Sequence, residues 1–273
     1  MQIHRVFALY FSPTGNTRLA ACTVAKQLAE HFGAPCEEID ITLPAAHAEP
    51  HTFAAGDFVV VGAPTYAGKL PNKMLPYYQE QLHGCGALAA AVVTFGNRSF
   101  DNSLAELCAT LEKNEFHTVG AAAFVGTHAF SDKLAPGRPN AEDVQALRSF
   151  ADAMADKIAA AASIPAPVQP TGDASAPYYV PKGVDGQPAK FLKAKPLTHE
   201  DKCTKCGLCA QECPMGSIDP ANPAQVSGVC IKCQSCVRKC PHHAKYFTDE
   251  AFLSHISMLE QNFTRPAENR IFV

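Results

Sequence analysis

The chain has 273 residues, of which 47% are hydrophobic, and a formal net charge of −3. This length allows two domains or one large one. The small net charge gives no reason to expect nucleic acid or an anionic membrane surface as a partner. The N-terminal residues lack the features of a signal peptide, and no apolar run reaches the roughly 18 residues that span a bilayer. We therefore expect a cytoplasmic protein.

Strand-like and helix-like patterns alternate over residues 1–163. Residues 4–11 are a short apolar run, and residues 18–32 repeat apolar side chains at helical spacing. Further strands are expected at 38–41, 57–63, 88–95 and 119–125, and further helices at 73–82, 103–113 and 141–162. Such alternation favours an α/β fold with a parallel sheet covered on both faces. Five strands and four helices fit a doubly wound sheet of order 2-1-3-4-5, whose ligands bind beyond the carboxyl ends of the strands.

Three loops at these strand ends have informative sequences. Residues 12–17, Ser-Pro-Thr-Gly-Asn-Thr, join the first strand to a helix N-terminus, where free N–H groups and the positive end of the helix dipole attract a phosphate. Residues 63–71, Ala-Pro-Thr-Tyr-Ala-Gly-Lys-Leu-Pro, follow the third strand, and residues 94–101, Thr-Phe-Gly-Asn-Arg-Ser-Phe-Asp, follow the fourth. The three loops would therefore meet at one edge of the sheet.

These three loops, in this order, resemble those of flavodoxins, which bind FMN, and the resemblance covers roughly residues 3–163. It implies a flavodoxin-like fold. It also implies that the phosphate is held by Ser12, Thr14, Gly15, Asn16 and Thr17. One side of the isoalloxazine would be lined by Pro64, Thr65, Tyr66, Ala67 and Gly68, and the other by Thr94, Phe95, Gly96, Asn97 and Phe100. Many flavodoxins stack a tryptophan on the flavin, and this chain has none. Tyr66 or Phe95 would take that place, or one flavin face would stay open to a donor.

Other polar residues of this half receive ordinary structural roles. We expect Arg98 to be solvated and His128, which follows the fifth strand, to be a structural histidine. The scattered cysteines Cys22, Cys36, Cys85 and Cys108 are expected to be small buried hydrophobes. No acid–base constellation is evident, so no catalytic side chain is assigned. No Gly-x-Gly-x-x-Gly motif follows a strand to open a second Rossmann unit, so direct NAD(P)H binding is not predicted.

Residues 164–197 are rich in proline and glycine, which resist helix formation, and we interpret them as an interdomain linker. Residues 198–247 carry two runs of the form C-x2-C-x2-C-x3-C-P, the second repeating the first 27 residues later. Their eight cysteines are Cys203, Cys206, Cys209, Cys213, Cys230, Cys233, Cys236 and Cys240.

Four thiolates hold a cubic iron–sulfur cluster, and in the two-cluster pattern the fourth cysteine of each run serves the other cluster. This predicts one set of Cys203, Cys206, Cys209 and Cys240, and another set of Cys230, Cys233, Cys236 and Cys213. The runs resemble the bacterial two-[4Fe–4S] ferredoxin domain. Zinc ribbons fit this spacing poorly, and a disulfide framework would need an oxidising compartment. His242 and His243 follow a complete thiolate set and are expected on the surface.

Residues 249–263 have a helical pattern, and the apolar residues 270–273 should pack on the flavin domain or, in a homodimer, on a second subunit. The whole chain resembles the flavodoxin–ferredoxin fusion oxidoreductases of anaerobic bacteria and archaea. The resemblance implies an oxidoreductase that passes electrons between a ferredoxin-like partner, two [4Fe–4S] clusters, FMN and an unidentified acceptor. The alternative is a pure electron carrier for a larger redox enzyme. A third, weaker reading is a metal-scaffold protein with a degenerate flavin site.

Overall fold

The computed structural model describes residues 2–273, and its centre is a mostly parallel sheet. Five parallel strands lie in the order β2-β1-β4-β6-β7, which is the predicted order 2-1-3-4-5 when these strands are numbered along the chain. They span Arg5–Tyr10 (β1), Cys36–Asp40 (β2), Asp57–Pro64 (β4), Leu88–Phe95 (β6) and His117–Val125 (β7). The three strands β4, β6 and β7 are buried almost throughout, as expected for a sheet covered on both faces.

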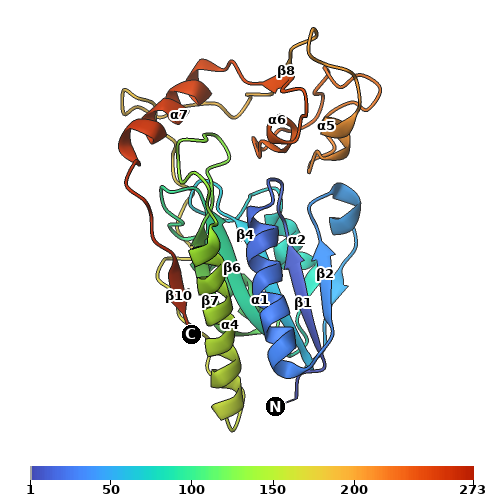
Figure 1. The fold of residues 1–273 in the computed structure, drawn as a ribbon, viewed down its shortest axis with the longest axis vertical. Coiled ribbons are helices and arrows are strands. Elements are labelled where there is room, and N and C mark those ends of the chain that lie inside the picture. Colours follow the sequence, from blue (N-terminus) through green and yellow to red (C-terminus); the bar gives the residue numbers. More distant parts are fainter. Residues whose placement is uncertain (1) are drawn as a thin grey trace.

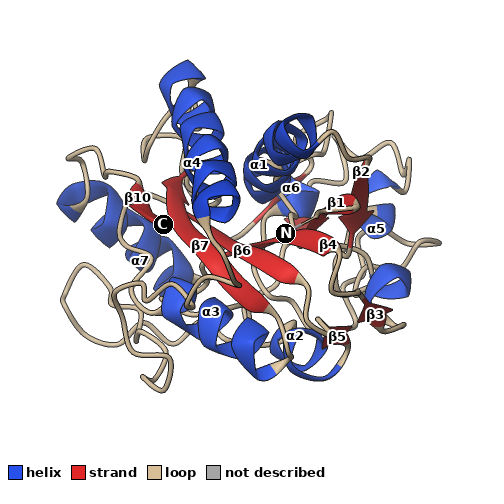
Figure 2. Ribbon diagram, turned by 90° about the horizontal axis from the view of Figure 1, so that it is seen from below, coloured by secondary structure: helices blue, strands red, loops and turns tan. Residues whose placement is uncertain are grey.

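Helices cover both faces of this sheet (Figure 2). On one face lie α1 (Asn16–Phe32) and α4 (Ala141–Ala160), and on the other lie α2 (Leu75–Glu80) and α3 (Ser103–Lys113). The helix α2 is shorter than the predicted range 73–82. The residues after it form a short strand, β5 (Leu82–His83), which pairs with β3 (His51–Thr52). A single 3-10 turn, η1 (Pro44–His47), precedes β3.

A sixth strand, β10 (Arg270–Phe272), pairs antiparallel with β7 and extends the sheet at its edge (Figure 1). The predicted five-stranded sheet omitted it, because a three-residue strand has no periodic pattern to detect. The tail therefore packs on the first domain, which was one of its two expected placements. Phe272 contacts the core on the α2–α3 face of the sheet.

Residues 198–247 form a small unit that lies over the carboxyl ends of the parallel strands (Figure 1). It contains two one-turn helices, α5 (Leu208–Gln211) and α6 (Ser235–Arg238), and an antiparallel pair of β8 (Leu197–Thr198) and β9 (Lys245–Tyr246). The sequence repeat is also a backbone repeat. Lys205 and Lys232 both have positive φ, and so do Gly207 and Gln234.

The C-terminal helix α7 (Glu250–Asn262) begins at the cap residue Asp249, whose carboxylate accepts a hydrogen bond from the Phe252 N–H. It packs through Met258 and Leu259 against Leu134 of the first domain. No helix within residues 2–273 has the length and apolar character needed to cross a lipid bilayer.

The four scattered cysteines only partly follow the prediction that they are buried. Cys22 and Cys108 are buried and Cys36 is half-buried, whereas Cys85 is exposed. Cys85 lies in the turn between β5 and β6 with a φ of 46°, so its side chain is held at the surface by the turn rather than packed in the core.

Candidate functional site

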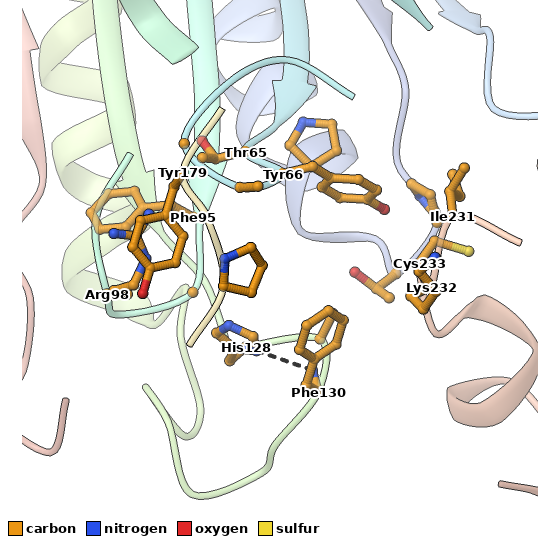
Figure 3. A pocket seen from close by; sticks show the side chains of 18 of the residues that line it. Thr65, Tyr66, Phe95, Arg98, His128, Phe130, Tyr179, Ile231, Lys232 and Cys233 are labelled. Carbon is orange, nitrogen blue, oxygen red and sulfur yellow. Dashed lines mark hydrogen bonds between the residues drawn. The ribbon is translucent and has the colours of Figure 1, made fainter. Parts of the chain in front are cut away.

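A cavity of about 440 Å³ lies between the carboxyl edge of the sheet and the C-terminal unit (Figure 3). The three loops identified in the sequence meet here. Eleven of the fifteen residues predicted to hold FMN line the cavity, namely Thr14, Asn16, Thr17, Pro64, Thr65, Tyr66, Ala67, Gly68, Thr94, Phe95 and Gly96. The loops converge because their strands are parallel neighbours in the sheet.

The phosphate loop is fixed by contacts between its own ends and neighbouring loops. Ser12 does not line the cavity; its hydroxyl accepts a hydrogen bond from the Arg18 N–H. Gly15, also outside the lining, starts α1 with a φ of 95° that favours glycine. The Thr17 hydroxyl shares a 2.7 Å hydrogen bond with that of Thr94, which joins the start of α1 to the end of β6.

Asn97 and Phe100 do not line the cavity either. The Asn97 amide donates to the carbonyls of Phe263 and Arg265, and its oxygen accepts from the Ala267 N–H. Asn97 thus holds the chain that leads from α7 to β10. Phe100 packs against Phe95 with ring centroids 5.5 Å apart, so it supports a cavity residue from behind.

Charged side chains in the cavity wall are all cationic. Lys73, Arg98 and Lys232 line it, and in the described part of the chain no Asp or Glu does. A wall with hydroxyls, backbone groups and cations but no carboxylate fits a group that carries a phosphate and a polar aromatic ring. The residues present therefore suit FMN.

Arg98 is not the solvated arginine that we expected, since its side chain is 16% exposed and pairs with Asp101. Its guanidinium carbon lies 4.0 Å from the ring centroid of Tyr179, a residue of the predicted linker. Figure 3 shows both side chains at one wall of the cavity, beside Phe95. A planar guanidinium over an aromatic face is a favourable cation–π arrangement.

The stretch that contains Tyr179 is bound along the first domain rather than free. We call residues 173–181 the strap. The buried Lys69 ammonium donates to the strap carbonyls of Ala174 and Ala176 and lies 3.0 Å from Glu106. The Tyr179 N–H donates to the carbonyl of Ala67, inside the loop after β4. The strap thereby brings Tyr178, Tyr179 and Pro181 to the cavity.

His128 lines the cavity and is held in one tautomer. Its Nδ1 accepts a hydrogen bond from the Phe130 N–H, so the proton of the neutral ring is on Nε2. Burial lowers the pKa of His128 to about 4, with help from the nearby His255 and Arg238. The ring also packs on Gly96, where an added Cβ would lie 2.4 Å from the His128 Cδ2. His128 is thus structural, as expected, and also part of the cavity wall.

Several further wall residues were not identified from the sequence. They are Asn72, Ser99, Thr127, Ala129, Phe130, Phe191, Leu192, Val229, Ile231, His255 and Leu259. Asn72 and Ser99 come from the loops after β4 and β6, and the others come from the loop after β7, the segment after the strap, the second cysteine run and α7. The residues outside the loops after β4 and β6 have no local signal, because they reach the cavity only through the packing of one part of the chain on another.

The eight cysteines of the two runs surround two small cavities, and each cavity is lined by four of them. One holds Cys203, Cys206, Cys209 and Cys240, which we call the outer set. The other holds Cys213, Cys230, Cys233 and Cys236, which we call the inner set. Each group of four combines three cysteines of one run with the fourth of the other.

The chemistry of these groups fits an iron–sulfur cluster. Backbone N–H groups point at sulfur atoms, with Ser217 donating to Cys213 and Ala244 donating to Cys240 at the equivalent place in the repeat, both at 3.3 Å. Such N–H···S bonds are typical of cluster sites and tune their potentials. Within residues 2–273, no three His, Cys, Asp or Glu side chains lie close enough together to bind one metal ion.

The inner set lies against the large cavity. Cys230 and Cys233 line both their own small cavity and the large one, whereas no member of the outer set lines the large cavity. Tyr66 lies at this shared wall, and its ring points toward Cys233 in Figure 3. Burial, and then the neighbouring Cys233 and Cys230 thiols, raise the pKa of Tyr66 well above its usual value.

Polar contacts hold the cysteine-bearing unit in this position. Arg238 of α6 donates to the carbonyls of His128 and Ala129 and pairs with Asp132, all in the loop after β7. Lys232 donates to the carbonyl of Leu192. The wall between the cavities is therefore built by contacts from both parts of the chain.

Parts of this chain are similar to known families and solved structures. Residues 196–219 and residues 227–249 each match a 4Fe-4S binding domain family. Solved structures similar to the N-terminal part include a flavodoxin from Streptococcus pneumonia TIGR4, which is 21% identical over 56% of this chain and 99% of its own, with a TM-score of 0.40. An archaeal flavodoxin is 14% identical over 57% and 99% of the two chains, with a TM-score of 0.39.

An NADH:FMN oxidoreductase, EMOB in its apo form, is 14% identical over 60% of this chain and 95% of its own, with a TM-score of 0.41. No curated protein matches the chain. The fold rests on the strand order and helix placement described above, and the two cysteine runs rest on the family matches. The chain thus joins a flavodoxin-like α/β domain to two 4Fe-4S binding domains, the composition of a flavodoxin–ferredoxin fusion.

Proposed function

We propose that the protein is an oxidoreductase that uses FMN and two [4Fe–4S] clusters, and that it passes electrons between a ferredoxin-like partner and an acceptor. The observation that carries this proposal is the shared wall: Cys230 and Cys233 line both the inner cysteine cavity and the cavity formed by the flavodoxin-like loops. Iron–sulfur clusters carry one electron at a time, whereas a flavin is capable of two-electron chemistry. A protein that holds both would link the two kinds of electron transfer.

The residues that would hold each group follow from the cavities. The loops at residues 14–17, 64–68 and 94–96 would hold FMN, with the phosphate at the N-terminus of α1. The inner set would hold one cluster and the outer set the other. The outer set is the more exposed, since Cys206 is exposed, so a protein partner would approach it from solvent. We propose a reducing, cytoplasmic and anaerobic setting for such a protein.

The alternative, a pure electron carrier for a larger redox enzyme, differs in what reaches the flavin. The wall residues Phe130, Phe191 and Leu259 give the cavity large apolar side chains from outside the three flavodoxin-like loops. Such a wall favours a small aromatic or conjugated acceptor over direct contact with a protein. This observation favours the enzyme over the carrier.

The test of the proposed function is anaerobic purification followed by assays of iron, acid-labile sulfide and FMN. We expect about eight irons, about eight sulfides and one FMN per chain, because each cubic cluster carries four irons. Full iron content with no affinity for FMN would overturn the flavoenzyme. Zinc in place of iron would overturn the redox assignment of the cysteines.

A further inference from the structure

Two buried hydroxyl groups have no hydrogen-bond partner in the protein, and they lie at the two cysteine cavities. Within residues 2–273, the buried side-chain nitrogen and oxygen atoms without a partner are the Thr198 Oγ1 and the Ser235 Oγ. Thr198 lines the cavity of the outer set, and Ser235 lines the cavity of the inner set. A buried hydroxyl without a partner loses its hydrogen bonds to water and gains none in return, so such groups are rare in native proteins.

The placement of each hydroxyl has its own local cause. Ser235 begins α6, directly before Cys236, and is fully buried. Thr198 comes from β8, which pairs with β9 next to the second cysteine run. The residue equivalent to Ser235 in the first run is Leu208, which has no hydroxyl. The repeat therefore does not explain the pair, and the hydroxyl without a partner comes from a different element at each cavity.

A neighbouring serine provides the contrast. Ser217 also lines the inner cavity and is also buried, but its hydroxyl donates to the carbonyl of Val229, with the carbonyl of Met215 at 3.3 Å. The protein thus satisfies one serine at this cavity with its own carbonyl groups and leaves the other without a partner. An acceptor inside the cavity would satisfy Ser235.

We infer that Ser235 and Thr198 each donate a hydrogen bond to the sulfur of an iron–sulfur cluster, Ser235 to the inner one and Thr198 to the outer one. This inference rests on the proposed function and adds to it two residues outside the cysteine motif. A donor to sulfur stabilises the reduced cluster, which carries one more negative charge, more than the oxidised one. Each hydroxyl therefore raises the reduction potential of one cluster and leaves the other unchanged.

The test is a reductive titration with dithionite of the purified full-length protein, followed by electron paramagnetic resonance. Ser235→Ala and Thr198→Val remove the two hydroxyls with little change in volume. We expect each variant to lower the potential of one of the two couples, a different one in each variant. The expected shift is roughly tenfold in the one-electron equilibrium, which is about 59 mV.

Three controls separate a hydrogen bond from a general disturbance. Ser227→Ala, at an exposed serine that lines neither cysteine cavity, should leave both potentials unchanged. Thr198→Ser keeps the hydroxyl and should restore the wild-type potential. Iron and sulfide content must equal that of the wild type in every variant, which shows that the sites still assemble.

The outcomes are distinct. Unchanged potentials in fully loaded Ser235→Ala and Thr198→Val would overturn the inference while the proposed function stands. An equal shift from Ser227→Ala would also overturn it, since the effect would then not depend on a hydroxyl inside a cysteine cavity. A wild-type protein that incorporates no iron would overturn the proposed function, and the inference with it.

Discussion

The guanidinium of Arg98 lies over the ring of Tyr179, 4.0 Å from the Arg98 Cζ to the ring centroid, and both side chains line the large cavity. Arg98 belongs to the loop after β6 and Tyr179 to the strap. The pair therefore joins the flavodoxin-like loops to a segment that looks like a linker in the sequence. It also places an aromatic side chain at the cavity of a protein that has no tryptophan.

Replacing Tyr179 should weaken FMN binding. We expect Tyr179→Ala to raise the dissociation constant of FMN by roughly tenfold, because a buried aromatic contact contributes about 0.5–1.5 kcal/mol beyond its area. Tyr179→Phe should bind nearly as the wild type does. Titration of FMN fluorescence against the apo-protein measures this. The neighbouring Val180 is exposed and does not line the cavity, so Val180→Ala is the matched control. Equal affinity for Tyr179→Ala and wild type would show that the strap is not part of the flavin site.

Removing a cysteine from each set should affect the flavin differently. Cys206→Ala and Cys233→Ala should each lower the iron content by about four atoms per chain, since each set holds one cubic cluster. Only Cys233→Ala should also change the absorption spectrum of bound FMN, because Cys233 lines the large cavity and Cys206 does not. The prediction is checked by iron analysis and difference spectra. It fails if Cys206→Ala perturbs the flavin as strongly as Cys233→Ala does.

The contacts of Arg238 should hold the C-terminal unit in place. Arg238→Ala removes two hydrogen bonds to main-chain carbonyls and should lower the free energy of unfolding by about 1–3 kcal/mol. Hydrogen exchange should then be faster in residues 228–240. Asp132, the ion-pair partner, is 87% exposed, so Asp132→Asn should change stability by less than about 1 kcal/mol. A large effect of Asp132→Asn would mean that the ion pair, and not the carbonyl contacts, holds the unit.

Asn97 should be important for stability rather than for flavin binding. Asn97→Ala removes three hydrogen bonds to the chain between α7 and β10. We expect a loss of about 2–4 kcal/mol in thermal or denaturant unfolding. Deleting residues 266–273, which removes β10, should also lower stability. Glu268→Gln, at an exposed position, is the control. Unchanged stability of both variants would contradict a structural role for the tail.

Stability should fall in mild acid because of His128. The pKa of His128 is lowered to about 4 in the folded protein, mainly by burial, whereas an unfolded histidine titrates near 6.5. Between these values the unfolded chain binds a proton that the folded protein does not, so stability decreases as the pH falls from about 6.5 toward 4. His128→Gln should flatten this part of the profile, measured by denaturant unfolding at several pH values. His243→Gln, at an exposed position, should not. An unchanged profile for His128→Gln would assign the acid sensitivity to another group.

Local sequence was sufficient for the parts of the site that depend on local geometry. The loop from Thr14 to Thr17 sits between a strand and a helix, so its place at the edge of the sheet followed from the alternating pattern. The eight cysteines of the two runs were found from spacing alone. Tyr179 and His255 were not found, because they reach the cavity only when the strap and α7 dock on the first domain. Asn97 lay in a flavin-type loop, yet its partners are some 170 residues away in the chain.

The pairing of β10 with β7 has a practical consequence for dividing the protein into fragments. A fragment that ends near residue 163 keeps the five parallel strands but lacks β10, so the edge of β7 loses its partner along Ala121–Ala123. An open, apolar strand edge invites pairing with another chain and aggregation. The flavodoxin-like part is therefore best produced by replacing residues 164–265 with a short loop and keeping β10 after it. This is how one would remove a domain that is inserted within another.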